Sequence, residues 1–224
     1  MPVVKNSNPD PERLAAAQGL GGTFAASMLA LCAGLVFIYG ATDRGQAFTT
    51  ETLRRAQVSR APQPIPDFSL TDSAGRSRGL LELLATGKKV WIVDFVYTRC
   101  QTVCSSLGAI YQQLQAQILE RGAQDQVGLL SISFDPQNDN PQSLRDYAAR
   151  MRMNPDVWKI MTLTAPKDRQ RLLDSFGIMV VPAPLGEFEH NAALHIVRPD
   201  GQLVRIMDYD APAPALDAAL ALVR

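Results

Sequence analysis

Two cysteines four residues apart, Cys100 and Cys104, have the clearest chemical potential in this 224-residue chain. They follow the apolar run "VWIVDF", which places them between a predicted strand and the first turn of a predicted helix. The free N–H groups and positive dipole end of a helix N-terminus favour a thiolate over a thiol, and Arg99 adds positive charge. Both sulfurs can point at one spot because residues four apart share a helix face. The pair is therefore a dithiol–disulfide couple or part of a metal site, with two inert core thiols as the disfavoured alternative.

Only two histidines are available to add a nitrogen ligand, His190 and His195. His195 lies in the alternating stretch "ALHIVRP", which predicts a strand, and a satisfied strand residue is its expected role. His190 precedes that strand in the loop "PAPLGEFEHN", from which it can return toward the cysteines. The odd spacing of the two histidines would turn their side chains to opposite faces if both lay on the strand. Spacing alone makes neither histidine a ligand.

Strands and helices alternate through the C-terminal part of the chain, and this order must position the cysteines. The stretch "DFSLTDSAGRSR" predicts a hairpin, and the run 194–207 predicts another. Strands are expected at 88–98, 126–134 and 157–164, followed by helices at 106–122, 141–151 and 166–178, with further helices at 80–86 and 214–224. This β-α-β-α order predicts an α/β core built on a mainly parallel sheet with helices on both faces.

Residues 14–42 contain no charged side chain and predict one transmembrane anchor. The segment 19–40 would span roughly 33 Å as a helix, close to the hydrocarbon thickness of a bilayer. A cleaved signal peptide is the alternative. Against it, the apolar run is longer than the usual signal core, and no small-x-small site ends it.

The predicted organisation is a tail, a span, a tether and one folded domain. Residues 1–13 form a cytoplasmic tail, 14–42 the anchor, 43–65 a linker and 66–224 the domain. The linker is polar, and the prolines near its end are expected to hold it extended. A first span with a short tail before it and a long globular part after it commonly acts as a signal anchor. The domain is therefore expected on the periplasmic side of a bacterial inner membrane.

Charge and cysteine content exclude two classes of protein. Lysine plus arginine and aspartate plus glutamate both number 22, and no basic run occurs, so nucleic acid is not an expected partner. Three cysteines are too few for a disulfide framework, so one bridge at most, between Cys100 and Cys104, is expected.

Three ordered motifs give the chain a family resemblance. The segments "DFVYTRCQTVC", "SISFDPQNDNP" and "EHNAALHIVRPDG" resemble the Sco (SenC) family of membrane-anchored, thioredoxin-like copper proteins, over roughly 66–209 together with the anchor. Members of that family carry a CxxxC pair, a D-P-x-x-D-x-P segment and a histidine nine residues before a P-D-G turn. His190, rather than His195, occupies that histidine position. Asp135 and Asp139 occupy the acidic positions of the middle motif.

The resemblance implies a fold, a cargo and a set of site residues. It implies a thioredoxin-like domain, with a central mixed sheet between helices, after one transmembrane helix. It further implies a copper metallochaperone for the binuclear copper centre of a cytochrome c oxidase subunit facing the same compartment. The metal ligands would be Cys100, Cys104 and His190, with Asp135 orienting the site loop. Another copper chaperone or a thiol reductase would be a further partner.

The donor set fits copper, but the resemblance leaves a rival function open. Two thiolates and one imidazole suit Cu(I) in three-coordinate geometry and tolerate Cu(II) with an added oxygen ligand, whereas structural zinc normally takes a fourth protein ligand. Oxidation to a Cys100–Cys104 disulfide would exclude the metal. Gln101, Thr102 and Ser105 replace the prolines and acidic residue common in the family motif. The rival is a thiol-disulfide oxidoreductase with the cysteines as its redox pair, and a third possibility is an assembly subunit in which they are dispensable.

Overall fold

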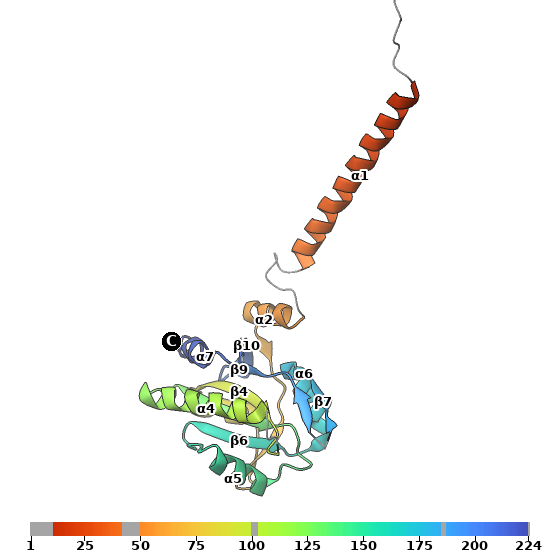
Figure 1. Ribbon diagram of the computed structural model, residues 1–224. Coiled ribbons are helices and arrows are strands. Elements are labelled where there is room, and N and C mark those ends of the chain that lie inside the picture. The colour runs from red at the N-terminus through yellow and green to blue at the C-terminus, as the bar shows by residue number, and fades with distance from the viewer. Residues whose placement is uncertain (1–10, 42–49, 100–102, 185–186, 224) are drawn as a thin grey trace, which may run out of the picture. The chain divides into compact units, whose positions relative to one another are not determined.

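The computed structural model describes residues 11–41, 50–99, 103–184 and 187–223 (Figure 1). The chain divides into two compact units, Met1–Arg54 and Arg55–Arg224. The first unit contains helix α1, Pro11–Ala41. Its segment Gly22–Gly40 has a mean hydropathy of 1.9 and no buried residue, so α1 is long and apolar enough to cross a bilayer.

The second unit is an α/β domain that contains the predicted strands and helices in the predicted order, together with elements that were not predicted. In chain order, the elements are α2 Thr50–Arg60, which begins before the unit boundary, β1 Gln63–Pro64, β2 Ser69–Asp72, β3 Ser77–Gly79, α3 Leu80–Ala85, η1 Thr86–Lys88, β4 Val90–Val96, α4 Val103–Glu120, β5 Val127–Ser133, α5 Pro141–Arg150, β6 Trp158–Leu163, η2 Pro166–Asp168, α6 Arg169–Phe176, β7 Val180–Pro182, β8 Phe188–His190, β9 Ala193–Val197, β10 Gln202–Asp208 and α7 Pro212–Leu220. The expected hairpins are β2–β3 and β9–β10.

The main sheet has the strand order β1-β10-β9-β4-β5-β6-β2-β3. Only β4, β5 and β6 pair in parallel, and every other neighbouring pair is antiparallel. The expectation of a mainly parallel sheet is therefore wrong, because the hairpins β2–β3 and β9–β10 add antiparallel strands on both sides of the three parallel ones. The central mixed sheet implied by the resemblance is confirmed.

Alternate residues of β4 build two hydrophobic cores, one on each face of the sheet. Val90, Ile92 and Val96 belong to the core under α4, α5 and α7, and α4 and α7 lie side by side (Figure 1). Trp91, Val93 and the aromatic residues that follow belong to the core under α2, α3 and α6. The strand is buried along its whole length, as its apolar run predicts.

The stretch expected to be an extended tether contains helix α2. Glu51 in its first turn and Arg60 in its last complement the helix dipole. Val58 on this helix is fully buried in the core, and β1 pairs with β10. The expected extended conformation is therefore wrong for residues 50–60, because one apolar side chain and a short strand attach this segment to the domain.

Val58→Ala should lower the free energy of unfolding by roughly 2 kcal/mol, because the smaller side chain leaves apolar volume unfilled at a buried position. Urea denaturation of the full chain in nonionic detergent measures it. Gln57→Ala, on the exposed side of the same helix, should change the value by less than about 0.5 kcal/mol. Equal effects of the two substitutions would show that α2 is not attached to the core in solution.

Candidate metal centre

The cysteine pair belongs to the connection between β4 and α4. Cys104 is the second residue of α4, so its predicted position in the first turn of a helix is confirmed. Cys100 lies outside the described residues, and so does the side chain of Cys104. The site is therefore built from the residues on either side of the pair and from those that hold them.

Thr98, two residues before Cys100, is clamped by a buried carboxylate. Its backbone N–H and its hydroxyl donate to Asp139, at 2.9 and 2.6 Å. The Ser133 hydroxyl donates to the same carboxylate, and Arg150 Nη2 donates to Thr98 O at 2.8 Å. Asp139 is fully buried, and this burial raises its pKa while the hydrogen bonds from Ser133 and Thr98 oppose the rise. The loop thus enters the cysteine segment from a fixed starting point.

Asp135 holds the next residue of the loop. Arg99 Nη2 lies 2.9 Å from Asp135 Oδ2, and Asn138 Nδ2 donates to both carboxylate oxygens. Asp135 thus forms an ion pair with Arg99, the residue before Cys100. A role for Asp135 in orienting this loop was predicted. The sequence motif indicates no separate role for Asp139, although Asp139 makes the more deeply buried contacts. The acidic spacing of the motif was the signal for both.

Asp139→Ala should destabilise the protein by roughly 2–4 kcal/mol, because it leaves the N–H of Thr98 and the hydroxyls of Thr98 and Ser133 without an acceptor in a buried site. Urea denaturation of the full chain measures this loss. Asp146→Ala, at an exposed position on α5, is the matched control and should change stability little. An equal, small effect of both would contradict the clamp.

His190 ends strand β8 of a separate two-stranded sheet. Val180 of β7 pairs with it, so the expectation that His190 lies in a loop is wrong. Both strands have only three residues, and Pro182 ends β7 while Pro184 follows it, so the sequence shows no strand periodicity here. The His190 ring meets the Phe134 ring edge-on at 5.2 Å. Since Phe134 directly follows β5, the neighbour of β4, the histidine lies by the end of the central strands.

One ring nitrogen of His190 is buried with a lone pair to offer. Nδ1 lies 3.1 Å from Asn191 O, which can only accept, so Nδ1 carries the hydrogen in the neutral ring. Nε2 is buried and has no hydrogen-bond partner among the described residues. Burial lowers the pKa of His190, opposed by its bond to Asn191, so protons compete for Nε2 only below the usual imidazole range. A neutral imidazole oriented through its other nitrogen is the form that binds metals.

His195 has the opposite environment. It is fully buried on β9, with Nδ1 3.2 Å from Val93 O and Nε2 3.1 Å from Phe176 O. The rings of Phe95 and Phe176 flank it edge-on. Both nitrogens thus lie within hydrogen-bond distance of backbone carbonyls, and the position of His195 on β9 agrees with the predicted strand.

Tyr97 connects the two halves of the site. Its hydroxyl donates to the Glu187 carboxylate and accepts from Phe188 N at 3.2 Å. Its ring meets the Phe188 ring edge-on at 5.3 Å. Tyr97 therefore ties the start of the β4–α4 connection, which carries the cysteines, to the segment that leads into β8 and His190. The contact with Glu187 spans 90 residues, and no sequence pattern indicated it.

The SCO1/SenC family matches residues 56–223 of this sequence. The chain belongs to that family. The match includes the cysteine pair, both acidic motif residues and His190. It begins inside α2, in agreement with the packing of that helix on the domain.

The relatives of this SCO1/SenC chain include solved structures. The chain is 28% identical to the SCO1 protein homolog of Bacillus subtilis over 183 residues, which cover 80% of this chain and 86% of the relative. It resembles copper-bound ScoI of Bradyrhizobium japonicum with 26% identity and a TM-score of 0.56, over 70% of this chain and 100% of that one. It resembles BsSco, a Sco-family cytochrome c oxidase assembly protein with an identified disulfide switch, with 26% identity and a TM-score of 0.60, over 73% of this chain and 92% of that one.

In this SCO1/SenC chain the described residues hold the segments on either side of the cysteines in place. Asp139 and Asp135 fix the approach to Cys100, helix α4 carries Cys104, and His190 presents a buried lone pair by the strand ends. No group of three cysteine, histidine or acidic side chains able to hold a metal occurs among the described residues, where neither thiol is included.

Proposed function

We propose that this SCO1/SenC chain is a copper metallochaperone that delivers copper to the binuclear centre of a cytochrome c oxidase during its assembly. The observation that carries the proposal is the buried Nε2 of His190, which has no partner among the described residues and is oriented through Nδ1. An unpaired buried acceptor costs folding free energy unless a ligand uses it. The copper-bound relative from Bradyrhizobium japonicum supports copper as that ligand.

Copper is the cargo in this proposal, and three side chains hold it. Cys100 and Cys104 supply thiolates and His190 supplies an imidazole, a soft set that suits Cu(I) and accepts Cu(II) with one more oxygen ligand. Asp139 and Asp135 keep the loop in position, as outer partners of metal ligands commonly do. Because the thiols must be reduced to bind, formation of the disulfide would release the metal.

The membrane helix keeps the domain near its acceptor. In this proposal, residues 14–42 anchor the chain in the inner membrane, residues 1–13 lie in the cytoplasm, and residues 66–224 form the copper-binding domain on the periplasmic side. Confinement to one membrane raises the effective concentration of the domain at the copper-bearing oxidase subunit. A copper donor or a thiol reductase on the same side completes the set of partners.

The competing function is a thiol-disulfide oxidoreductase that keeps the cysteines of an oxidase subunit reduced. The disulfide switch of BsSco and the helix-start position of Cys104 favour it. Exchange between a dithiol and a disulfide needs no imidazole ligand. His190 therefore separates the two functions.

A His190→Gln strain tests the proposal by its cytochrome oxidase activity and by the copper content of its oxidase. Copper delivery predicts that both fall to the level of a strain lacking the protein, while the thiol–disulfide potential of the purified variant stays close to wild type. Glu189→Gln, at an exposed position on the same strand, should leave both unchanged. Full oxidase activity in His190→Gln, together with its loss in Cys100→Ser, would replace copper delivery with thiol reduction.

A further inference from the structure

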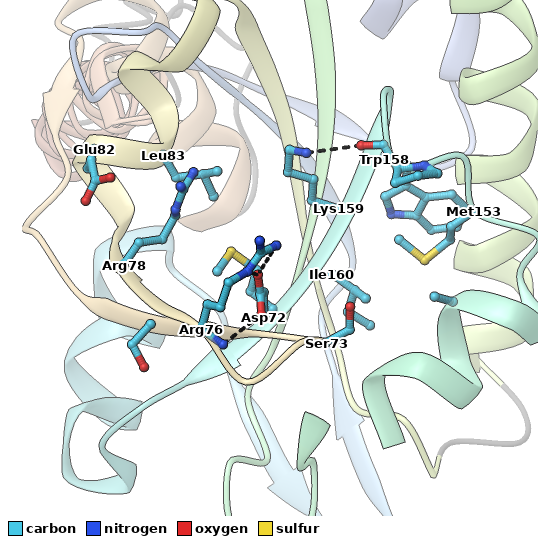
Figure 2. A pocket seen from close by; sticks show the side chains of 14 residues that line it. Asp72, Ser73, Arg76, Arg78, Glu82, Leu83, Met153, Trp158, Lys159 and Ile160 are labelled. Atoms are coloured by element: carbon cyan, nitrogen blue, oxygen red, sulfur yellow. Dashed lines mark hydrogen bonds and ion pairs between the residues drawn. The ribbon is translucent and has the colours of Figure 1, made fainter. Parts of the chain in front are cut away.

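A cavity of about 710 Å³ opens beside the β2–β3 hairpin, away from the candidate metal centre. Its lining comes from that hairpin, α3, the end of α5 and β6 with the loop before it (Figure 2). Its lining does not include Asp135, Asp139 or His190. Its volume lies within the range of small-molecule sites, roughly 300–1,000 Å³.

Three cationic side chains line this cavity: Arg76 from the β2–β3 turn, Arg78 from β3 and Lys159 from β6. Figure 2 shows them on one side and in the middle of the space. Arg78 has no hydrogen bond or ion pair with any residue in the described parts of the chain. The carboxylates in the lining are Asp72 and Glu82. Positive charge is thus in excess there.

Asp72 is committed to organising the turn that presents Arg76. Its carboxylate accepts from the backbone N–H of Ala74 at 2.8 Å and of Arg76 at 2.9 Å. It also pairs with the Arg76 guanidinium at 2.9 Å, and Gly75 takes the positive φ of 79° that the turn requires. The turn backbone is thus organised by Asp72, while the Arg76 side chain itself remains 81% exposed.

Lys159 is crowded by like charges. Its ammonium donates to Pro155 O at 3.1 Å, which uses one of its three hydrogens. Burial, followed by the positive charges of Lys89, Arg78 and Arg76, lowers its pKa, and the negative charge of Asp156 opposes this shift. A bound anion would relieve this repulsion.

The opposite wall of the cavity is apolar. Half-buried Met153 and Trp158, of which only 1% is exposed, lie there together in Figure 2 with Ile160 near them, whereas Leu83 lies on the other side beside Arg78. The indole N–H of Trp158 already donates to Ser131 Oγ at 2.9 Å, so the ring meets the cavity without an unused donor. A ligand that reaches this wall must carry an apolar group as well as a charge.

We propose that the cavity binds a phosphate ester with an apolar substituent. Arginine matches phosphate oxygens in bidentate geometry, and Arg78 and Lys159 are the two cations of the lining that Asp72 does not engage. The apolar substituent lies against Met153, beside the small exposed part of Trp158. The phosphate ester comes either from a free organic phosphate or from the headgroup of an anionic lipid, which share this chemistry.

Binding of 1-naphthyl phosphate to the reduced, copper-free full chain in nonionic detergent tests the site by isothermal titration calorimetry. The aryl phosphate should bind at least tenfold more tightly than inorganic phosphate. Arg78→Gln and Lys159→Gln should each weaken it at least tenfold, with urea midpoints near wild type. Lys167→Gln, an exposed lysine on η2, should have no effect. Wild-type affinity in both cavity variants, an equal loss in Lys167→Gln, or no binding would overturn the proposal.

Reconstitution into nanodiscs distinguishes the two sources of phosphate. If phosphatidylglycerol nanodiscs weaken 1-naphthyl phosphate binding relative to phosphatidylcholine nanodiscs, the natural occupant is a lipid headgroup. If both give the affinity found in detergent, it is a free phosphate ester. The copper-free protein is used throughout, so this result is independent of the proposed copper delivery.

Discussion

The wild-type protein should lose roughly 4 kcal/mol of unfolding free energy between pH 4 and pH 8 because of Asp94, and Asp94→Asn should abolish this loss. Asp94 lies in the middle of the central strand β4, on the face covered by α4, and only 1% of it is exposed. No group lies at normal hydrogen-bond distance and angle from either carboxylate oxygen among the described residues. The hydroxyls of Ser131 and Tyr111 oppose the effect of burial only in part: Tyr111 donates to Ile92 O, whereas Ser131 accepts from Trp158 and keeps its own hydrogen to donate. Burial therefore dominates and raises the pKa of Asp94 to about 7.

The sign of the effect follows from where the proton is held. In the unfolded chain the carboxyl ionises near 3.8, whereas the folded protein keeps its proton up to about 7. Between these pH values the carboxyl is ionised in the unfolded chain but still protonated in the folded protein. The free energy of unfolding therefore falls as pH rises and levels off above pH 7. Each pKa unit corresponds to about 1.36 kcal/mol, which gives the expected size over roughly three units.

Urea denaturation of the reduced, metal-free full chain at pH 4 and pH 8 measures this. The difference in unfolding free energy between Asp94→Asn and wild type should be roughly 4 kcal/mol more favourable to the variant at pH 8 than at pH 4. The contribution of Asp139 is common to both proteins and cancels. Asp146→Asn, at an exposed position, should show the same difference at both pH values. An equal difference for Asp94→Asn at the two pH values would contradict the buried, neutral carboxyl.

His190→Gln should weaken Cu(I) binding by at least about 100-fold, because outer partners of a metal site alone are worth about 10–100-fold and His190 is proposed as a direct ligand. Competition with a chromogenic Cu(I) chelator on the reduced full chain measures the affinity. Glu189→Gln should bind like wild type. A loss of less than threefold in His190→Gln would remove the histidine from the site and leave a two-sulfur centre.

The sequence carried the local elements of the fold but not the contacts between distant segments. Continuous apolar runs identified β4 and β5, and α4 ends at Glu120, two residues before the predicted stop at Gly122, which has a positive φ of 61°. By contrast, α2 attaches to the core through one valine in a polar helix, and β7–β8 consists of three-residue strands. Such short signals disappear in any periodicity reading, because tertiary packing alone makes them stable.

The site shows the same division. The spacing of the cysteines and the motif position of His190 named the ligands proposed here. The Thr98–Asp139 clamp spans 41 residues and the Tyr97–Glu187 contact spans 90, so each exists only once the sheet has formed. The cavity was also invisible, because Arg76, Arg78 and Lys159 are ordinary surface charges until β2–β3 and β6 bring them together.

X-ray absorption spectroscopy of the reduced full chain loaded with one equivalent of Cu(I) tests the copper site most directly. The proposed site predicts two sulfur scatterers and one imidazole nitrogen around copper, with the imidazole signature lost in His190→Gln and retained in Glu189→Gln. A copper environment without sulfur, or one identical in wild type and His190→Gln, would contradict it.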